Sequence, residues 1–201
     1  MRAVVYDRWG GPEVLRIDNL PTPVPKDDEL LVRVRAASIN SWDWDLMIGR
    51  PYFVRPEGFA KGPKRLGFDV AGIVEAVGKD ATRFKPGDAV CGDIGWRGPG
   101  TLAEYACGAA TSFAPMPATL SFERAASLPQ AGMLALQALA GKTPVEVGQH
   151  VLINGAGGGV GTIGIQICKM LGAIVTGVDG ADKIETMRAA LNGAYRVTET
   201  R

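Results

Sequence analysis

One segment decides the fold: Gly148-Gln149-His150-Val151-Leu152-Ile153-Asn154-Gly155-Ala156-Gly157-Gly158-Gly159-Val160-Gly161. An apolar strand-like run leads into small residues, and a helix-like sequence follows at once. This order lets the backbone approach a pyrophosphate, whose charge is held by N–H groups at the helix N-terminus. The strict G-x-G-x-x-G spacing is not met, because the chain has Ala156-x-Gly158-x-x-Gly161. The segment predicts a dinucleotide-binding turn, with a purely structural β–α turn as the alternative.

The sequence after this turn favours the nucleotide interpretation. A second strand-like run ends at Asp179, which lies 18 residues after Gly161, about where a dinucleotide fold places its ribose-binding acid. We expect Asp179 to accept hydrogen bonds from a ribose 2′-OH and to repel a 2′-phosphate, which favours NAD; the alternative is a solvated turn carboxylate. Lys183 is expected to pair with a phosphate, or else to be solvated. The predicted cofactor-binding residues here are Ala156, Gly157, Gly158, Gly159, Val160, Gly161, Asp179 and Lys183.

The periodicity of the chain changes near residue 120. Before it, short runs with strand-like alternation, bounded by glycine or proline, predict a small barrel or folded sheet. After it, strands alternate with helices, which predicts a parallel sheet. We therefore expect an α/β protein with a small barrel or folded sheet before residue 120 and a parallel sheet after it.

Composition excludes several classes of protein. The chain has 201 residues, of which 46% are apolar, and a net charge of +1, so it offers a core but no electrostatic footprint for nucleic acid. No window of roughly 18 apolar residues predicts a membrane span. The N-terminus has no signal-peptide pattern, so we expect a cytoplasmic protein. A single histidine and three cysteines without C-x-x-C spacing argue against a thiol-rich zinc site.

Motifs along nearly the whole chain resemble one known family. Around the glycine turn they are Gly148-Gln149, Leu152, Ala156-Gly157-Gly158-Gly159, Gly161, Gln166 and Lys169. Nearer the N-terminus they are Gly10-Gly11-Pro12-Glu13-Val14-Leu15, Ala37-Ser38-Ile39-Asn40, Asp69-Val70-Ala71-Gly72 and Phe84-Lys85-Pro86-Gly87-Asp88. With these motifs the chain is similar to the zinc-independent medium-chain dehydrogenases/reductases of the quinone oxidoreductase (zeta-crystallin-like) group. The resemblance implies a GroES-like catalytic β-barrel domain at residues 1–120. It implies the N-terminal half of a Rossmann domain, a parallel doubly wound fold, at residues 121–201, with the active site between the two.

The resemblance also implies a reaction. Zinc-containing relatives carry a cysteine and a Gly-His-Glu where this chain has Asn40-Ser41 and Gly67-Phe68-Asp69, so no metal is expected. The implied activity is zinc-independent, NAD(P)H-dependent transfer of hydride to a quinone or to an activated alkene or carbonyl such as an enone. The implied catalytic residues are Asn40, near the nicotinamide, and Asp43; Gln130 is implied to approach the nicotinamide as a further cofactor-binding residue. Their alternatives are a strand-end turn residue, a helix cap and a polar residue at a helix entrance, respectively.

An aromatic stretch follows Asn40 and is interpreted in two ways. Its members either line a flat apolar pocket or belong to the core; they are Trp42, Trp44, Tyr52, Phe53 and Phe59.

The number of strands supports a rival hypothesis. A doubly wound Rossmann sheet has six strands, and only about three can be placed before Arg201. The alternative function is therefore a truncated, catalytically silent homologue with weak nucleotide binding or a protein-interaction role; a small sugar- or nucleotide-binding module is a further rival. An exposed half-sheet edge favours a homodimer. The expected partner is otherwise a small-molecule substrate, with no nucleic acid and no membrane.

Overall fold

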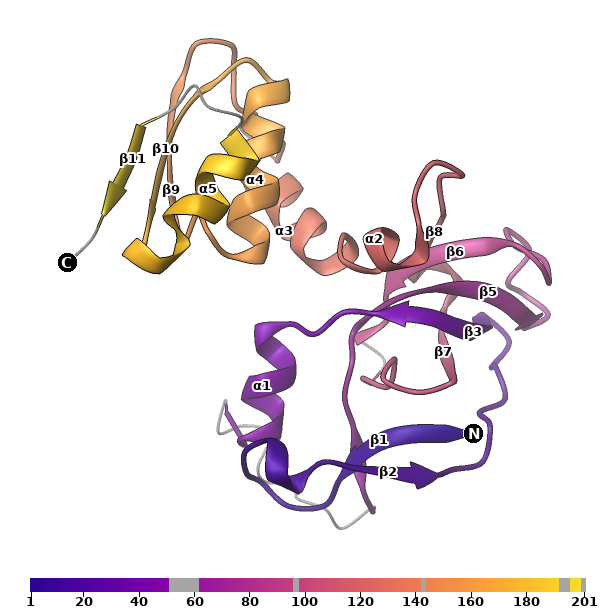
Figure 1. Ribbon diagram of the computed structural model, residues 1–201. Coiled ribbons are helices and arrows are strands. Elements are labelled where there is room, and N and C mark those ends of the chain that lie inside the picture. Colours follow the sequence, from indigo (N-terminus) through magenta and orange to yellow (C-terminus); the bar gives the residue numbers. More distant parts are fainter. Residues whose placement is uncertain (51–61, 96–97, 142–143, 192–195, 200–201) are drawn as a thin grey trace. The chain divides into compact units, whose positions relative to one another are not determined.

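The computed structural model describes residues 1–50, 62–95, 98–141, 144–191 and 196–199 (Figure 1). The chain divides into two compact units, Met1–Gln130 and Ala131–Arg201. The first consists of antiparallel sheets with short helices, and the second alternates strands and helices. This confirms the predicted change from β to alternating β and α structure.

The division falls after Gln130 because helix α2 (Phe122–Ala126) packs against strands of the first unit. Ala125 and Ala126 of α2 are buried together with Ala71 in one apolar cluster. Ser121 caps the helix, since its hydroxyl accepts a hydrogen bond from the Arg124 N–H at 3.4 Å, as Ser121 in front of an apolar run predicts. The domain limit near residue 120 stays a prediction.

The larger sheet of the first unit has five antiparallel strands in the order β7-β3-β5-β6-β8. Their bounds are β3 Glu29–Ala37, β5 Asp69–Val77, β6 Ala89–Asp93, β7 Tyr105–Ala109 and β8 Phe113–Pro115. Glu29–Val32 are all buried, whereas Arg33 and Arg35 are exposed, so only the second half of β3 shows the predicted alternation, with one face toward the core. That core includes Leu30, Val70, Val74, Val90 and Phe113.

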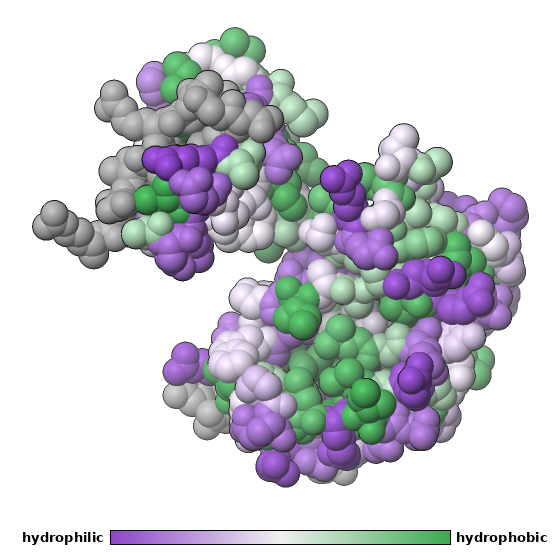
Figure 2. Space-filling view, in the orientation of Figure 1, coloured by the Kyte–Doolittle hydropathy of each residue, from purple (hydrophilic) through white to green (hydrophobic). Residues whose placement is uncertain are grey.

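A second sheet, in the order β2-β1-β4, completes the first unit. Its strands are β1 Arg2–Tyr6, β2 Arg16–Asn19 and β4 Lys64–Arg65. Helix α1 (Ser41–Met47) contributes Met47 to an apolar cluster with Tyr6, Val14 and Leu66. Burial raises the pKa of Tyr6 to about 12. Figure 2 shows apolar side chains gathered between the regions of β1 and β3 on the visible face of this unit.

The second unit has a parallel sheet in the order β11-β10-β9, with helices between successive strands. Its elements are β9 His150–Asn154, α4 Gly159–Met170, β10 Ile174–Asp179, α5 Ile184–Leu191 and β11 Arg196–Glu199, preceded by α3 Pro129–Leu139, which begins within the first unit. Ile165, Cys168 and Met187 of the helices pack with Val175 of β10 in one buried cluster. These strands and connections are those of half a doubly wound sheet.

In the part of the chain that the structure describes, no helix has the length and apolar character needed to cross a membrane.

Candidate functional site

The glycine turn joins β9 to α4 through a sharp change of direction. Gly155 adopts a φ of 79°, in the left-handed region that favours glycine. The N–H groups of Gly155 and Ala156 donate to the Val178 carbonyl at 2.9 and 3.1 Å, which fixes the turn beside the end of β10. Ala156 is completely buried, and α4 begins at Gly159 with Gly158 as its N-cap.

Two glycines of the turn stand where a side chain has no room. A Cβ on Gly161 would overlap the Gly155 carbonyl oxygen and lie 2.6 Å from the Ala156 Cα. A Cβ on Gly157 would lie 2.6 Å from the Lys183 Cβ and 3.2 Å from an oxygen of Asp179. This close approach of helix to turn is the geometry that lets a dinucleotide pyrophosphate reach the N–H groups of a helix.

The next residues of the turn have more space. Beyond their immediate neighbours, a Cβ on Gly158 would meet only the Gly155 carbonyl oxygen, at 3.3 Å, and one on Gly159 only the Ala131 Cβ, at 3.7 Å. Val160, in the first turn of α4, is exposed. The predicted cofactor residues of this turn therefore form a compact base, Ala156, Gly157 and Gly161, and a more open N-terminal turn, Gly158, Gly159 and Val160.

Asp179 is tied to the glycine turn rather than solvated. One of its carboxylate oxygens accepts the Gly157 N–H at 2.9 Å, and the other accepts the Gly180 N–H at 2.8 Å. Lys183 Nζ lies 3.3 Å from the carboxylate, and the Asp179 side chain is only 13% exposed. The two backbone hydrogen bonds, followed by Lys183, lower the pKa of Asp179. The sequence predicted neither the bond to Gly157 nor the ion pair with Lys183.

Asn40 and Asp43 form a reciprocal capping box at the start of α1. Asp43 accepts the Asn40 N–H at 2.8 Å and, through its other oxygen, the Gly67 N–H at 2.6 Å. The Asp43 side chain is buried, and this burial raises its pKa against the opposing effect of the two hydrogen bonds. The structure thus gives Asp43 the position of a helix cap, which was the alternative to a catalytic role.

Asp69, at the start of β5, brings Asn40 and Gln130 together. It accepts hydrogen bonds from Asn40 Nδ2 at 3.1 Å and from the Gln130 backbone N–H at 2.9 Å. The Gln130 side chain donates to Asp93 at 3.4 Å. Sequence reasoning noted Asp69 only as part of a motif, although an acidic residue that opens an apolar strand is itself a signal of a buried polar contact.

The predicted site residues therefore fall into two groups, each within one unit. Asn40, Asp43 and Gln130 belong to the first unit and are joined through Asp69. The glycine turn, Asp179 and Lys183 belong to the second.

Known proteins resemble this chain along nearly its whole length. Residues 26–118 match the model of the alcohol dehydrogenase GroES-like domain. The chain is 35% identical to the quinone oxidoreductase of Homo sapiens over 98% of its own length and 58% of that relative. The chain is therefore similar to the quinone oxidoreductases of the medium-chain dehydrogenase/reductase family, as its motifs predict. The fold is accordingly a GroES-like barrel followed by a partial Rossmann domain.

Solved structures of quinone oxidoreductases give the same result. The enzyme from Coxiella burnetii superposes with a TM-score of 0.89 at 33% identity, covering 100% of this chain and 62% of that one. The Escherichia coli enzyme, solved in complex with NADPH, has a TM-score of 0.85 at 30% identity. The match covers 98% of this chain and 58% of that one. The chain thus spans less than two thirds of the quinone oxidoreductases that it matches.

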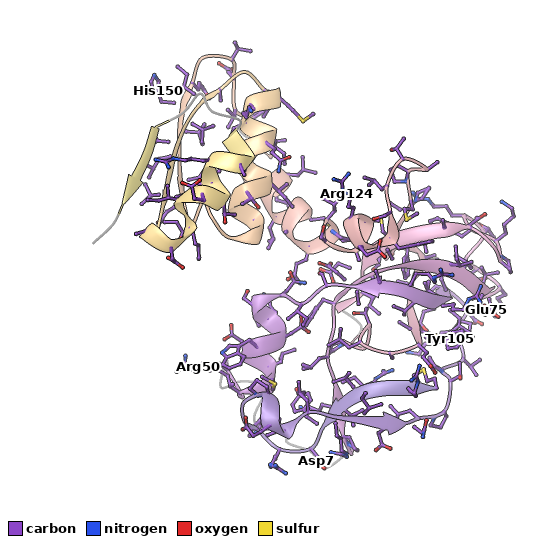
Figure 3. The ribbon with its side chains drawn as sticks, viewed as in Figure 1. Asp7, Arg50, Glu75, Tyr105, Arg124 and His150 are labelled. Atoms are coloured by element: carbon purple, nitrogen blue, oxygen red, sulfur yellow. The ribbon has the colours of Figure 1, made fainter. Side chains whose placement is uncertain are left out.

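The absence of zinc, which the resemblance implies from Asn40-Ser41 and Gly67-Phe68-Asp69, stays a prediction. Within the described ranges, no group of three or more histidine, cysteine, aspartate or glutamate residues is arranged to hold a metal ion. His150 is exposed and opens β9, at the opposite end of that strand from the glycine turn (Figure 3). It does not contribute to either group of site residues.

The aromatic stretch is only partly described. Trp42 and Trp44 are exposed on α1, so neither is a core residue. Tyr52, Phe53 and Phe59 lie outside the described residues.

Proposed function

We propose that this protein is an NAD(P)H-dependent oxidoreductase that transfers hydride, without zinc, to a quinone or to an activated alkene or carbonyl. The observation that carries the proposal is the glycine turn, where the Gly161 position leaves no room for a side chain and Gly158 and Gly159 open the N-terminus of α4. The NADPH complex of the Escherichia coli quinone oxidoreductase supports the same assignment.

In this proposal the site residues of the second unit bind the cofactor, and those of the first unit interact with the hydride acceptor. The first turn of α4 binds the pyrophosphate through its N–H groups and the partial positive charge of the helix N-terminus. A bound nicotinamide supplies the hydride. The Asn40 carboxamide donates a hydrogen bond to the acceptor oxygen, which in the absence of a metal is the interaction that stabilises developing negative charge. Gln130 and Asp43 hold the surroundings of Asn40.

Asp179 and Lys183 decide the choice of cofactor in the same proposal. The Asp179 carboxylate stands at the end of β10, where the adenosine ribose of a dinucleotide is expected, and its charge disfavours a 2′-phosphate. Lys183 is paired with this carboxylate at 3.3 Å. We therefore expect NADH to bind more tightly than NADPH, and Asp179→Ser to shift the preference toward NADPH by about tenfold, about 1.4 kcal/mol.

Cofactor binding and turnover test the proposal separately. NADH and NADPH are titrated by calorimetry, and their oxidation is followed with a panel of quinones and enones. We expect binding and turnover in the wild type, and binding with a kcat lowered by about 100-fold in Asn40→Ala, as for the loss of one donor to a developing oxyanion. If neither cofactor binds and no acceptor is reduced, the proposal is wrong.

A catalytically silent homologue is the second candidate. It is favoured by Asp43, a predicted catalytic residue that is buried and whose two oxygens accept the N–H groups of Asn40 and Gly67. Cofactor binding without reduction of any acceptor by the wild type supports this candidate over the first.

A further inference from the structure

Three segments, two of which carry candidate site residues, meet at one buried carboxylate. Asp69 is fully buried at the start of β5. Its Oδ2 accepts hydrogen bonds from the Ser38 hydroxyl at 3.0 Å and from Asn40 Nδ2 at 3.1 Å, and its Oδ1 accepts the Gln130 N–H at 2.9 Å. Ser38 follows β3, Asn40 is the N-cap of α1, and Gln130 lies in the first turn of α3.

These three contacts require a group at residue 69 that only accepts hydrogen bonds. An ionised carboxylate offers two oxygens with several lone pairs, so it satisfies all three donors at once. Burying such a charge is costly unless it is hydrogen-bonded. An asparagine at residue 69 would present its NH₂ group either to Ser38 and Asn40 or to the Gln130 N–H, so at least one donor would lose its acceptor. The arrangement is therefore specific for a carboxylate at this position.

Other titratable groups surround Asp69. Asp93 on β6 is its register partner, and Cys91 lies on the same strand as Asp93. Burial raises the pKa of Asp69, the hydrogen bonds from Asn40, Gln130 and Ser38 oppose that shift, and Asp93 adds to it. Asp69 in turn contributes to the raised pKa of Cys91, where burial is the main cause.

The contact with Asp69 fixes the orientation of the Asn40 side chain. Its carboxamide takes part in the capping box of α1 on one side and donates from Nδ2 to Asp69 on the other. Because the amide nitrogen carries two hydrogens, one N–H stays available to a ligand after the other is directed to Asp69. Asn40 is only half-buried, so a ligand can reach it.

We propose that Asp69 is a positioning residue for hydride transfer: it holds the Asn40 carboxamide with an N–H toward the acceptor oxygen and ties the first turn of α3 to the same point. This inference rests on the proposed function, in which Asn40 touches the acceptor. Asp69 itself is fully buried and acts through Asn40. A misplacement of a positioned group by about 1 Å can cost about 100-fold in rate.

A double-mutant cycle tests the kinetic part. The variants are Asp69→Asn, Asn40→Ala and the double mutant, and Ser38→Ala is the matched control because it removes a different donor from the same carboxylate oxygen. We expect Asp69→Asn to lower kcat by about 10- to 100-fold with little change in KM, and Ser38→Ala to change kcat by less than about threefold, as expected for one peripheral hydrogen bond. The double mutant should be no slower than Asn40→Ala. Multiplying effects would show that Asp69 acts independently of Asn40 and would overturn the proposal.

A second measurement does not depend on activity. In ¹⁵N-labelled protein, the side-chain NH₂ signals of Asn40 are assigned by their loss in Asn40→Ala. We expect these signals to move in Asp69→Asn and to stay in place in Ser38→Ala. Unchanged Asn40 signals in a folded Asp69→Asn protein contradict the proposal, even if the wild type turns over quinones. If the wild type reduces no acceptor, the proposed function fails and these signals still decide whether Asp69 orients Asn40.

Should Asp69→Asn fail to fold, Asp69→Glu takes its place in both measurements. Glutamate keeps the acceptor charge and moves it by one methylene, so the Asn40 signals should shift and kcat should fall while the ordered fold is retained. An Asp69→Glu variant that leaves both the signals and kcat unchanged contradicts the proposal.

Discussion

Gly161 shows at the scale of one residue why the turn needs glycine. A Cβ there would collide with the backbone of Gly155 and Ala156, which cannot move aside as a flexible side chain can. We expect Gly161→Ala to lower the free energy of unfolding of the second unit by about 1–3 kcal/mol and to weaken NADH binding. Chemical denaturation and calorimetric titration measure the two effects.

Gly159→Ala is the matched control for this substitution. A Cβ at Gly159 would meet only the Ala131 Cβ, at 3.7 Å, which is an ordinary van der Waals contact. Since alanine also favours the helix that begins at this residue, we expect no loss of stability. Equal destabilisation by both variants would contradict the argument.

Asp179 gives a pH-dependent prediction at the same scale. Its pKa is lowered from the ordinary value of 3.8, first by the N–H groups of Gly180 and Gly157. The stability that it contributes is therefore fully present above pH 3.8 and is lost as the pH falls through the lower, folded-state pKa. We expect the free energy of unfolding of the second unit to depend less on pH in Asp179→Asn than in the wild type below about pH 4, the ordinary pKa of an aspartate.

Amide hydrogen exchange of Gly157 and Gly180 follows this loss directly. Their protection should fall on acidification in the wild type and should depend less on pH in Asp179→Asn. Protection that is independent of pH in the wild type would mean that the carboxylate does not hold the turn.

At the scale of an element, α1 depends on the cap that Asp43 provides. Asp43→Ala leaves the N–H groups of Asn40 and Gly67 without their acceptor, at about 1–3 kcal/mol for each donor that stays buried. We expect the free energy of unfolding of the first unit to fall by about 2–3 kcal/mol, measured by urea denaturation. Asp45→Ala is the control, because Asp45 lies on the same helix and is only half-buried. This variant should change the free energy of unfolding by less than about 0.5 kcal/mol.

The elements also show what the sequence could and could not predict. The barrel strands and the β–α–β order follow from local periodicity, and the glycine turn from its composition, so they were predicted and are confirmed. The hydrogen bonds of Asp69 join residues 29 and 61 positions away in the chain. No local pattern encodes such contacts, because they depend on how β3, α1, α3 and β5 pack. The same holds for the hydrogen bond that the Gly157 N–H donates to Asp179, 22 positions away.

At the scale of the whole molecule, the parallel sheet has a covered and an uncovered face. The helix-facing residues Val151, Ile153 and Val175 pack with the buried cluster of α4 and α5. On the other face Leu152 is 69% exposed, and Ile174 at the start of β10 is exposed as well. Among the described strands, β9 pairs only with β10, so its second edge offers unpaired backbone groups. Exposed apolar residues beside an open strand edge favour association.

We therefore expect the 201-residue chain to self-associate through β9, with a second copy of the same chain against this edge. A lysine in place of Leu152 puts a charge on the apolar face without disturbing the core, because Leu152 is already exposed, and charge is a common protection of open edges. Leu152→Lys should lower the weight-average sedimentation coefficient at high protein concentration. Ile17→Lys, on exposed β2 of the first unit, is the control and should leave it unchanged. A wild type that stays monomeric at every concentration, or one that both variants affect equally, would show that this edge does not mediate association.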